Sequence, residues 1–526
     1  MIAKVRKKTA AVHIALLVLL LPGLCFGNNG VAGMATPPHK AAQAKNIILF
    51  IGDGMQLEHE IAYSRYLTGE DFALVWNNFD YEVPVATWDV TTYNRYARDL
   101  GAAPFAYDSF DPMVGYNPNE GGFERYPLDT AGAYNYFLRP RYATDSASAA
   151  TAMATGVKTD SGNLAWLSGD PEGGDLRTIA EMVRESNGGA IGVVSTVPFS
   201  HATPAAFVSH NVSRNNYFTG RGGYQGMGIA DEIIQMVRPE VVIGGGHPDY
   251  NSGFMSRALY DELQRGSEYL FVERLPDTDG GRALRNAARQ AAKQGKKLFG
   301  LFGSADGNFE PPLVAHDPGY PQTEAATKEN PTLADATLAA LEVLSTNEKG
   351  FFLMVEQGDI DWANHANDYL WMMGTMHDLH EAVKAAVAFV NQQGDHMDWS
   401  NTLLLVTSDH GNSYMRLNPA LPMGKGELPS PSEIRVWNQN QVEAVMPKVT
   451  FGTGSHTNEL VSLYVQGAAA DLHAQYEGFW YPGTRIIDNT HIFEAMREFA
   501  FKWEYDGWRP GTSRKPFLEK VPGFAR

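Results

Sequence analysis

Acidic and histidine side chains follow three apolar stretches of this sequence, each at the point where the stretch ends. The run NIILFI leads to Asp53, the run FFLMV to Glu356, and the run TLLLVT to Asp409 and His410. Taken singly, Asp53 before a glycine is more typical of a turn than of a metal ligand. The Asp409-His410 pair alone favours neither a turn nor a metal site. Together, these carboxylates would repel one another at one sheet edge unless cations lay among them. The pattern therefore indicates a metal site.

Further metal ligands are indicated by the spacing of two residues and by the presence of the other candidate ligands. Asp361 and His365 are four positions apart, so on a helix they would share one face, as two ligands of one metal must. His456 lies in the glycine-rich segment GTGSHTNEL, and by itself a loop histidine is more often exposed than bound to a metal. The single cysteine, Cys25, lies in the N-terminal apolar segment. A transition metal must therefore be held by His, Asp and Glu.

The stretch TDSASAATAMATG places Asp145 and Ser146 before an alanine-rich segment that favours a helix. One interpretation is that either residue only caps this helix. The other is that Ser146 lies where free backbone N–H groups and the helix dipole attract an anion, so that its hydroxyl meets a phosphoryl group. The stretch alone favours the cap, and the ligand pattern elsewhere favours the second interpretation.

The elements that must position these residues follow from the apolar pattern. Runs without clean alternation predict strands buried on both faces, at 46–51, 190–196, 240–245, 297–302, 351–355, 402–407 and 460–465. Helical patterns lie between several of them, at 175–186, 281–295, 331–345 and 367–393. The alternation predicts an α/β fold, a three-layer sandwich with a central, mostly parallel sheet and helices on both faces. Such sheets carry their sites at the carboxyl ends of strands.

The two ends of the chain and two insertions do not follow this alternation of strands and helices. Basic residues followed by a short apolar stretch predict a signal peptide over 1–27, and a polar linker follows over 28–44. A retained N-terminal anchor is the weaker alternative. The catalytic domain is expected over 45–503, with insertions at about 92–141 and 413–454 near one end of the sheet, before a tail over 504–526. We therefore expect a periplasmic or secreted protein whose mature chain has no membrane span.

Charge and composition narrow the class of partner. The formal net charge of −18, from 60 acidic and 42 basic residues, argues against a nucleic acid held by phosphate contacts. An anionic substrate would need a local positive site, which metal ions can provide. A chain of 526 residues that is 44% hydrophobic can bury one large core with insertions.

Taken in chain order between about residues 45 and 500, a set of segments resembles the alkaline phosphatase family. The segments are IGDGM, TDSASAATAMATGVKT, ATPAAFVSHNVSR, VVIGGG, FFLMVEQGDIDWANHAND, VTSDHG and GSHTNE. The resemblance implies a hydrolase of small phosphate monoesters that works through a phosphoserine and releases inorganic phosphate. It also implies two Zn²⁺ ions and a third ion, usually Mg²⁺.

The same resemblance implies roles for individual residues. Ser146 is the expected nucleophile, Arg214 the phosphate-binding residue, and Asp145 the residue that steadies Arg214. The expected ligands are Asp361, His365 and His456 for one zinc, Asp53, Asp409 and His410 for the other, and Asp53, Thr203 and Glu356 for the third ion. Two metal ions about 4 Å apart can hold the attacking and leaving oxygens of an in-line displacement. An arginine offers phosphate two parallel donors, which a lysine does not.

The positions of His201 and Trp362 vary within the family. Many bacterial members carry aspartate at the position of His201 and animal enzymes carry histidine; imidazole is a softer neighbour than carboxylate, so Co²⁺ or Zn²⁺ could compete with Mg²⁺ at the third site. Relatives carry basic residues that help to hold phosphate at the position of Trp362. A tryptophan there predicts weaker phosphate binding and faster product release, or a residue that only packs the wall of the site.

Members of the family are commonly homodimers, although monomers occur.

Several rival functions share part of this pattern. Phosphodiesterases of the same superfamily usually use a threonine nucleophile and lack the third metal site, whereas Thr203, Glu356 and Arg214 favour a monoesterase. Sulfatases need a C/S-x-P-x-R motif, which is absent around Ser146. A cofactor-independent phosphomutase would need a substrate domain that the insertions do not obviously supply. A secreted binding protein would have no reason to keep a nucleophile. The motifs contact phosphate only, so they leave the physiological substrate open.

Overall fold

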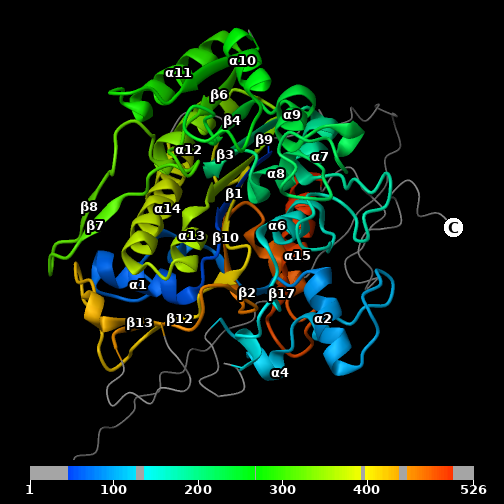
Figure 1. Cartoon of the computed structure of the whole chain (residues 1–526), viewed down its shortest axis with the longest axis vertical. Coiled ribbons are helices and arrows are strands. Elements are labelled where there is room, and N and C mark those ends of the chain that lie inside the picture. Colours follow the sequence, from blue (N-terminus) through cyan, green and yellow to red (C-terminus); the bar gives the residue numbers. More distant parts are fainter. Residues whose placement is uncertain (1–44, 126–134, 267, 393–396, 437–446, 502–526) are drawn as a thin grey trace, which may run out of the picture. The chain divides into compact units, whose positions relative to one another are not determined.

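A ten-stranded sheet forms the centre of the computed structural model, which describes residues 45–125, 135–266, 268–392, 397–436 and 447–501 (Figure 1). The strand order is β17 (Ile487–Asp488), β2 (Tyr81–Ala86), β16 (Val461–Gly467), β10 (Thr402–Thr407), β1 (Lys45–Gly52), β9 (Gly350–Gln357), β3 (Ala190–Pro198), β4 (Val241–Gly245), β6 (Lys297–Leu301) and β5 (Tyr269–Glu273). Only β16 runs antiparallel to its neighbours, β10 and β2. The prediction of a mostly parallel sheet is confirmed.

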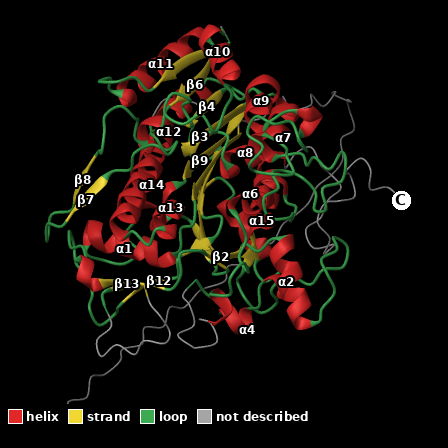
Figure 2. Cartoon of the chain, viewed as in Figure 1, coloured by secondary structure: helices red, strands yellow, loops and turns green. Residues whose placement is uncertain are grey.

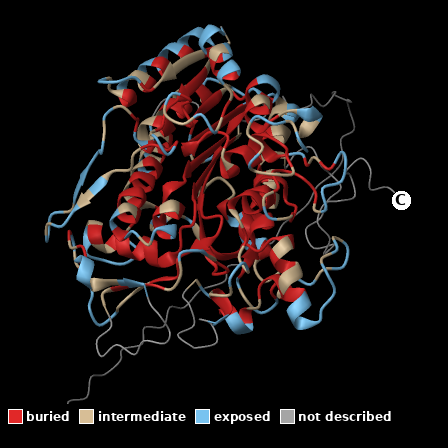
Figure 3. Ribbon diagram, in the orientation of Figure 1, coloured by how far each residue is buried: buried red, intermediate tan, exposed pale blue. Residues whose placement is uncertain are grey.

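Helices cover both faces of the sheet, as Figure 2 shows. Along β1, Ile47 and Leu49 pack into one hydrophobic cluster, whereas Ile48 and Phe50 pack into the other. The first cluster includes α6 (Ser146–Thr155), α7 (Ile179–Asn187), α8 (Ala202–Val208), α10 (Arg257–Arg265) and α15 (Asn489–Phe501). The second includes α1 (Leu57–Thr68), α11 (Gly280–Gln294), α12 (Leu333–Leu344) and α14 (Tyr369–Val390). Both faces of the sheet are buried (Figure 3), which confirms the three-layer sandwich.

The strands expected from apolar runs are the ones buried on both sides. β1, β3, β4, β6, β9, β10 and β16 all fall on predicted runs. The strands of the ten-stranded sheet that the pattern missed, β2, β5 and β17, lie at or next to its edges. β2 carries Glu82 and Pro84, and β5 is mostly half-buried, so neither forms the continuous apolar run of a central strand.

The two predicted insertions form small structures of their own. Within the described part of 92–141 lie α2 (Val90–Leu100), α3 (Pro112–Gly115) and α4 (Pro118–Gly121), packed around a separate aromatic cluster that includes Trp88 and Tyr116. Within 413–454, β12 (Met415–Leu417), β14 (Val449–Phe451) and β13 (Ile434–Val436) form a three-stranded sheet in that order. A two-stranded hairpin, β7 (Leu313–Ala315) and β8 (Gln322–Glu324), lies elsewhere in the chain.

The predicted signal peptide (1–27), the linker (28–44) and the tail (504–526) lie outside the described residues. In the part of the chain that the structure describes, none of the helices combines the length and the apolar character needed to span a bilayer.

Helix α6 is fixed at both ends by residues that its sequence provides. Asp145 is the N-cap, and its side chain accepts a hydrogen bond from the Ser148 backbone N–H at 3.1 Å. Gly156 ends the helix in the left-handed region at φ 74° and donates its N–H to the Ala152 carbonyl. The end of α6 packs on α15, where a Cβ at Gly156 would lie 2.5 Å from the Phe493 ring.

Replacing Gly156 by alanine should therefore destabilise the fold by about 2–4 kcal/mol, since it combines a left-handed backbone penalty with overpacking against Phe493. Chemical denaturation would measure this loss. Gly101 is a matched control, because it ends α2 at φ 66° with nothing within 4 Å of its added Cβ. Gly101→Ala should cost only about 1 kcal/mol. Equal losses in the two variants would contradict the role of Phe493.

Candidate active site

The carboxyl ends of β1, β9 and β10 meet at one edge of the sheet. The strand register places Ile51 beside Glu356 on one side and beside Thr407 on the other. Asp53 follows β1 and Asp409 follows β10, so both carboxylates reach the same edge as Glu356. All three acids are fully buried, with exposures of 0–2%. Burying several like charges together is unfavourable unless protons or cations accompany them.

Asp53, Asp409 and His410 form the first group of metal-type ligands. His410 Nε2 lies 3.4 Å from Asp53 Oδ1 and 3.3 Å from Asp409 Oδ2. The other oxygen, Asp409 Oδ1, accepts a hydrogen bond of 3.0 Å from the Gly54 N–H. This bond leaves Oδ2 directed toward the group.

Asp361, His365 and His456 form the second group. Asp361 and His365 lie on α13 (Asp359–His365), and His456 lies on β15 (His456–Thr457), which pairs with β11 (Gly411–Asn412). His365 Nε2 lies 3.2 Å from Asp361 Oδ2, and His456 Nε2 lies 3.2 Å from Asp361 Oδ1 and 3.1 Å from His365 Nε2. Ligands of a tetrahedral zinc are about 3.3 Å apart, so these separations suit that ion.

The outward nitrogens of both imidazoles are fixed by backbone carbonyls. His365 Nδ1 contacts the Gly454 carbonyl at 2.8 Å, and His456 Nδ1 contacts the Thr144 carbonyl at 2.8 Å. Because a carbonyl only accepts hydrogen bonds, each Nδ1 carries a proton, and Nε2 is the nitrogen that a metal ion can bind once the ring is neutral. The His456 ring also stacks on His410, with ring centroids 3.6 Å apart, so the two groups of ligands are adjacent.

A third group surrounds Glu356. Ser195 Oγ donates a hydrogen bond to Glu356 Oε2. Thr203, in the first turn of α8, is fully buried, and its hydroxyl oxygen and Glu356 Oε1 both lack a hydrogen-bond partner in the protein. A hydroxyl oxygen and carboxylate oxygens are the ligands that Mg²⁺ prefers.

Unpaired buried polar atoms gather at these three groups. Among the described residues, those without a hydrogen-bond partner here are Asp53 Oδ1, Thr203 Oγ1, Glu356 Oε1, Asp409 Oδ2 and His410 Nδ1. Such atoms are costly to bury unless something else satisfies them. Bound cations would satisfy the oxygens, and the ligand types fit zinc in the first two groups and magnesium in the third.

The pKa values of these side chains report the same crowding. Burial, together with the Asp409 carboxylate, outweighs the Ser195 hydroxyl and raises the pKa of Glu356 to about 8. Burial and the neighbouring carboxylates raise the pKa of Asp53 well above its ordinary value. Burial lowers the pKa of His410 to about 4. For His365, the Asp361 carboxylate overcomes the effect of burial and raises the pKa to about 9. Without cations, the site therefore retains protons that metal ions must displace.

Ser146, the first residue of α6, lies beside the metal-type ligands. It is 2% exposed, and its Oγ lies 3.2 Å from His410 Nε2. Arg214 Nη1 contacts Asp145 Oδ2 at 3.0 Å. Although burial opposes ionisation, Arg214 and the hydrogen bonds from Ser148 lower the pKa of Asp145 to about 2. A hydroxyl, a helix N-terminus and a guanidinium therefore converge with the ligand groups, an arrangement suited to a phosphoryl group.

His201 lies beside Arg214, and Trp362 lies beside His201. His201 Nε2 is 3.5 Å from Arg214 Nη2, and the His201 and Trp362 ring centroids are 6.3 Å apart. Burial and the neighbouring guanidinium lower the pKa of His201 to about 3, so this imidazole is neutral at physiological pH. Trp362 brings no charge to the site. Of these three side chains, Arg214 is therefore the one that carries a positive charge.

Two supporting side chains were not identified from the sequence. Asn412 Nδ2 donates to Asp361 Oδ1 at 2.6 Å and so fixes one ligand of the second group. Ser195 does the same for Glu356. Ser195 lies within a predicted strand, and Asn412 lies two positions after His410. Ser195 gives no signal in the sequence because it lies within an apolar run. Asn412 could have been identified from its proximity to the Asp409-His410 pair.

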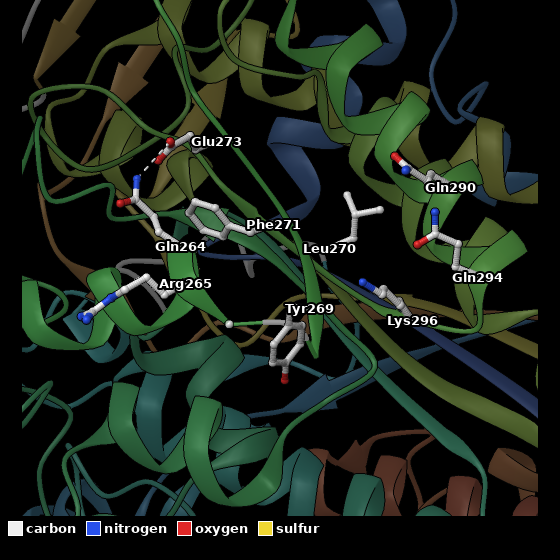
Figure 4. Close-up of a pocket in the computed structure, with 10 residues that line it drawn as sticks. Gln264, Arg265, Tyr269, Leu270, Phe271, Glu273, Gln290, Gln294 and Lys296 are labelled. Atoms are coloured by element: carbon white, nitrogen blue, oxygen red, sulfur yellow. Dashed lines mark hydrogen bonds between the residues drawn. The ribbon is translucent and has the colours of Figure 1, made fainter.

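A surface hollow of about 660 Å³ lies apart from these ligand groups, at the sheet edge formed by β5 (Figure 4). Its lining includes Arg265, Tyr269, Glu273, Gln290 and Lys296. None of the ligand groups contributes to that lining, so the chemistry expected from the sequence lies elsewhere.

Comparison with known proteins assigns the chain to a family. A model of the alkaline phosphatase family matches residues 114–426. The chain is 31% identical over 403 residues to an alkaline phosphatase of Escherichia coli, covering 72% of each protein. It is also 31% identical over 369 residues to alkaline phosphatase 3 of Bacillus subtilis, where the match covers 70% of this chain but 61% of that protein. The solved alkaline phosphatase of Thermus thermophilus shares the fold, with a TM-score of 0.55, 22% identity, and coverage of 88% and 92%. The chain belongs to the alkaline phosphatase family of phosphomonoesterases.

Proposed function

We propose that this chain hydrolyses small phosphate monoesters through a phosphoserine at Ser146 and releases inorganic phosphate. The observation that carries the proposal is the position of Ser146 Oγ, 3.2 Å from His410 Nε2 and beside an arginine that Asp145 holds in place. Family membership supports the reaction class, and the ligand groups support a metal-dependent site.

The ligands would hold two zinc ions and one magnesium ion. Asp361, His365 and His456 would hold one zinc; Asp53, Asp409 and His410 the other; and Asp53, Thr203 and Glu356 the magnesium. When bound, these ions neutralise charge on the attacking and leaving oxygens of the displacement. A solved variant of the TAB5 alkaline phosphatase, from an Antarctic bacterium, carries aspartate in place of a histidine and has magnesium bound. His201 is a neutral imidazole near this group, so Co²⁺ or Zn²⁺ remains an alternative at the third site.

The protein's own residues supply binding and orientation. Arg214 donates two parallel hydrogen bonds to phosphate oxygens, and the free N–H groups at the start of α6 face the same anion. Ser146 Oγ loses its proton and forms a bond to phosphorus while the bond from phosphorus to the ester oxygen breaks; the departing oxygen takes up a proton and leaves as the alcohol. Water then cleaves the serine phosphate and regenerates the Ser146 hydroxyl. Because the surrounding side chains are buried, each hydrogen bond to the transferred group is strengthened.

The cellular setting is part of the same proposal. The basic and apolar segment over 1–27 supports a periplasmic or secreted protein. The net charge of −18 supports small phosphate esters over nucleic acids as substrates. A homodimer is the assembly that the family resemblance favours.

Replacing Ser146 by alanine should lower kcat/KM for a chromogenic phosphate monoester by about 10³-fold or more, because no phosphoserine can form. The assay compares the monoester with the matching diester after metal-stripped protein is titrated with zinc, magnesium and cobalt. Ser64→Ala is a matched control, since Ser64 is buried in α1 and bonds only local groups. Full activity in Ser146→Ala would exclude this nucleophile, and a preference for the diester would exclude a monoesterase.

Metal removal should destabilise the protein more at high pH. In the metal-free protein Glu356 loses its proton near pH 8 and His365 near pH 9, whereas the unfolded chain loses them near 4.5 and 6.5. The stability contributed by Glu356 therefore falls as the pH rises from about 4.5 to 8, and that contributed by His365 falls as the pH rises from about 6.5 to 9. Bound cations remove this loss, so the difference in Tm between loaded and stripped protein should widen from about pH 4.5 to 9. Differential scanning fluorimetry would measure it.

The variant Glu356→Gln is the control for the pH experiment, because an amide does not titrate. Its Tm difference should widen less between pH 6.5 and 8 than that of the native protein. A Tm difference that stays constant or narrows with pH would contradict the assignment of Glu356 and His365 as ligands.

Replacing Trp362 by lysine should strengthen inhibition by inorganic phosphate about tenfold, because it adds a cation next to His201, the imidazole that lies beside Arg214. Steady-state kinetics with added phosphate would give the inhibition constant. Trp362→Phe keeps an aromatic ring without charge and should leave that constant within about twofold. Unchanged inhibition in Trp362→Lys would show that Trp362 only packs the wall of the site.

A further inference from the structure

A buried carboxylate outside the ligand groups connects to the phosphate-binding arginine. Asp89 is the N-cap of α2 and is 1% exposed. Its Oδ1 accepts a hydrogen bond of 2.7 Å from the Thr92 N–H, which accounts for the cap. Its Oδ2 is turned the other way and is contacted by two hydroxyls that belong to different segments, those of Ser148 and Ser161. A cap alone does not require this second pair of contacts.

The first contact leads to Asp145 through α6. Ser148 Oγ lies 2.9 Å from Asp89 Oδ2 and 2.7 Å from Asp145 Oδ1. The Ser148 hydroxyl therefore bridges the two carboxylates. Asp145 Oδ2 is the oxygen that contacts Arg214 at 3.0 Å. One side of the bridge thus sets the orientation of the carboxylate that holds the arginine.

The second contact leads to the backbone of Arg214. Ser161 Oγ lies 2.5 Å from Asp89 Oδ2. The next residue, Gly162, donates its N–H to Asp145 Oδ1 at 3.0 Å and accepts a hydrogen bond of 2.8 Å from the Arg214 N–H. Asp89 therefore holds the segment that fixes both the Asp145 side chain and the Arg214 main chain.

The number of protons on the hydroxyls limits which hydrogen bonds Asp89 and Asp145 can accept. A serine hydroxyl has one proton, so Ser148 cannot donate to Asp89 and to Asp145 at the same time. Burial raises the pKa of Asp89, although the Ser161 hydroxyl opposes this effect. A neutral group that donates to Ser148 would leave the Ser148 proton free for Asp145. An asparagine amide has two N–H donors and could serve both hydroxyl oxygens.

We infer that Asp89 is a positioning residue for phosphate binding, acting on Arg214 through Ser148 and through the Ser161–Gly162 segment. The inference rests on the proposed role of Arg214 in holding phosphate. It gives the edge of the 92–141 insertion a function in the reaction, because Asp89 both begins α2 and orders the arginine on a distant segment. Arginine side chains lose considerable rotamer freedom when they are fixed, so an ordered guanidinium binds an anion more tightly than a mobile one.

The test is a double-mutant cycle with Asp89→Ala and Arg214→Ala in the metal-loaded enzyme. The readouts are the inhibition constant of inorganic phosphate and the KM and kcat for a chromogenic monoester. Arg214→Ala should weaken phosphate inhibition about 30-fold, and Asp89→Ala about fivefold to tenfold. KM should rise more than kcat falls in Asp89→Ala. In the Arg214→Ala background, the added Asp89→Ala change should alter phosphate inhibition less than twofold, because the residue through which it acts is absent.

Two further variants separate positioning from general damage. Asp89→Asn should restore phosphate inhibition to within about twofold of the native value, because the amide can serve Ser148 and Ser161. Thr92→Ala removes a hydroxyl that interacts with the backbone of Asp89 and leaves the Oδ2 contacts intact. It should lower Tm without changing phosphate inhibition.

Each outcome assigns the failure to one proposal. An unchanged inhibition constant in Arg214→Ala would overturn the proposed role of Arg214 itself. A normal effect of Arg214→Ala with no effect of Asp89→Ala would overturn the inference about Asp89 alone. An Asp89→Ala effect that persists at full size in the Arg214→Ala background would show that Asp89 acts by general destabilisation, and would also overturn it.

Discussion

Mutual repulsion among buried carboxylates is the constraint on which the rest of the site depends. Asp53, Glu356 and Asp409 are brought together by the carboxyl ends of three adjacent parallel strands, and none of them is exposed beyond 2%. In a low-dielectric interior this arrangement is unfavourable for the ionised groups. These three carboxylates can therefore be ionised together only if positive charge lies next to them. Backbone carbonyls hold the Nδ1 atoms of His365 and His456, so that their Nε2 atoms face the carboxylates. Divalent cations, which imidazole and carboxylate bind together, can supply the positive charge.

Rigid surroundings keep these groups in place. β1 and β9 are buried on both faces, and the helices on either side fill the core with close-packed apolar side chains. Ligands on or directly after such strands have little freedom to move apart. His456 and Asn412 lie on the short strands β15 and β11, which pair with each other outside the main sheet. The hydrogen bond from Asn412 to Asp361 connects this pair of strands to α13. The site therefore combines a stiff base with ligands supplied by less regular segments.

The side of the site that carries Ser146 and Arg214 depends on hydrogen bonds between segments that are distant in the sequence. Asp145 at the start of α6 is linked to Arg214 directly and to Gly162 through its other oxygen. Asp89 adds a connection from the edge of the aromatic insertion. Each of these contacts is short and partly or fully buried, where hydrogen bonds to charged groups are strongest. The Ser146 hydroxyl is therefore surrounded by a network that orders the Arg214 guanidinium.

The sequence by itself determined the layered α/β fold, the central strands, and the residue types from which a metal site can be built. Continuous apolar runs identify strands that are buried on both faces, and the acids that end them lie at one edge because parallel strands end together. The strands β2, β5 and β17 escaped this reasoning because edge positions do not need a continuous apolar run. Only the tertiary structure decided that Asp89, Ser161 and Asn412 take part, since their contacts join segments far apart in the chain. Hydrogen-bond partners of this kind leave no periodic trace in a sequence, because they depend on distance in space and on the direction of single side-chain atoms.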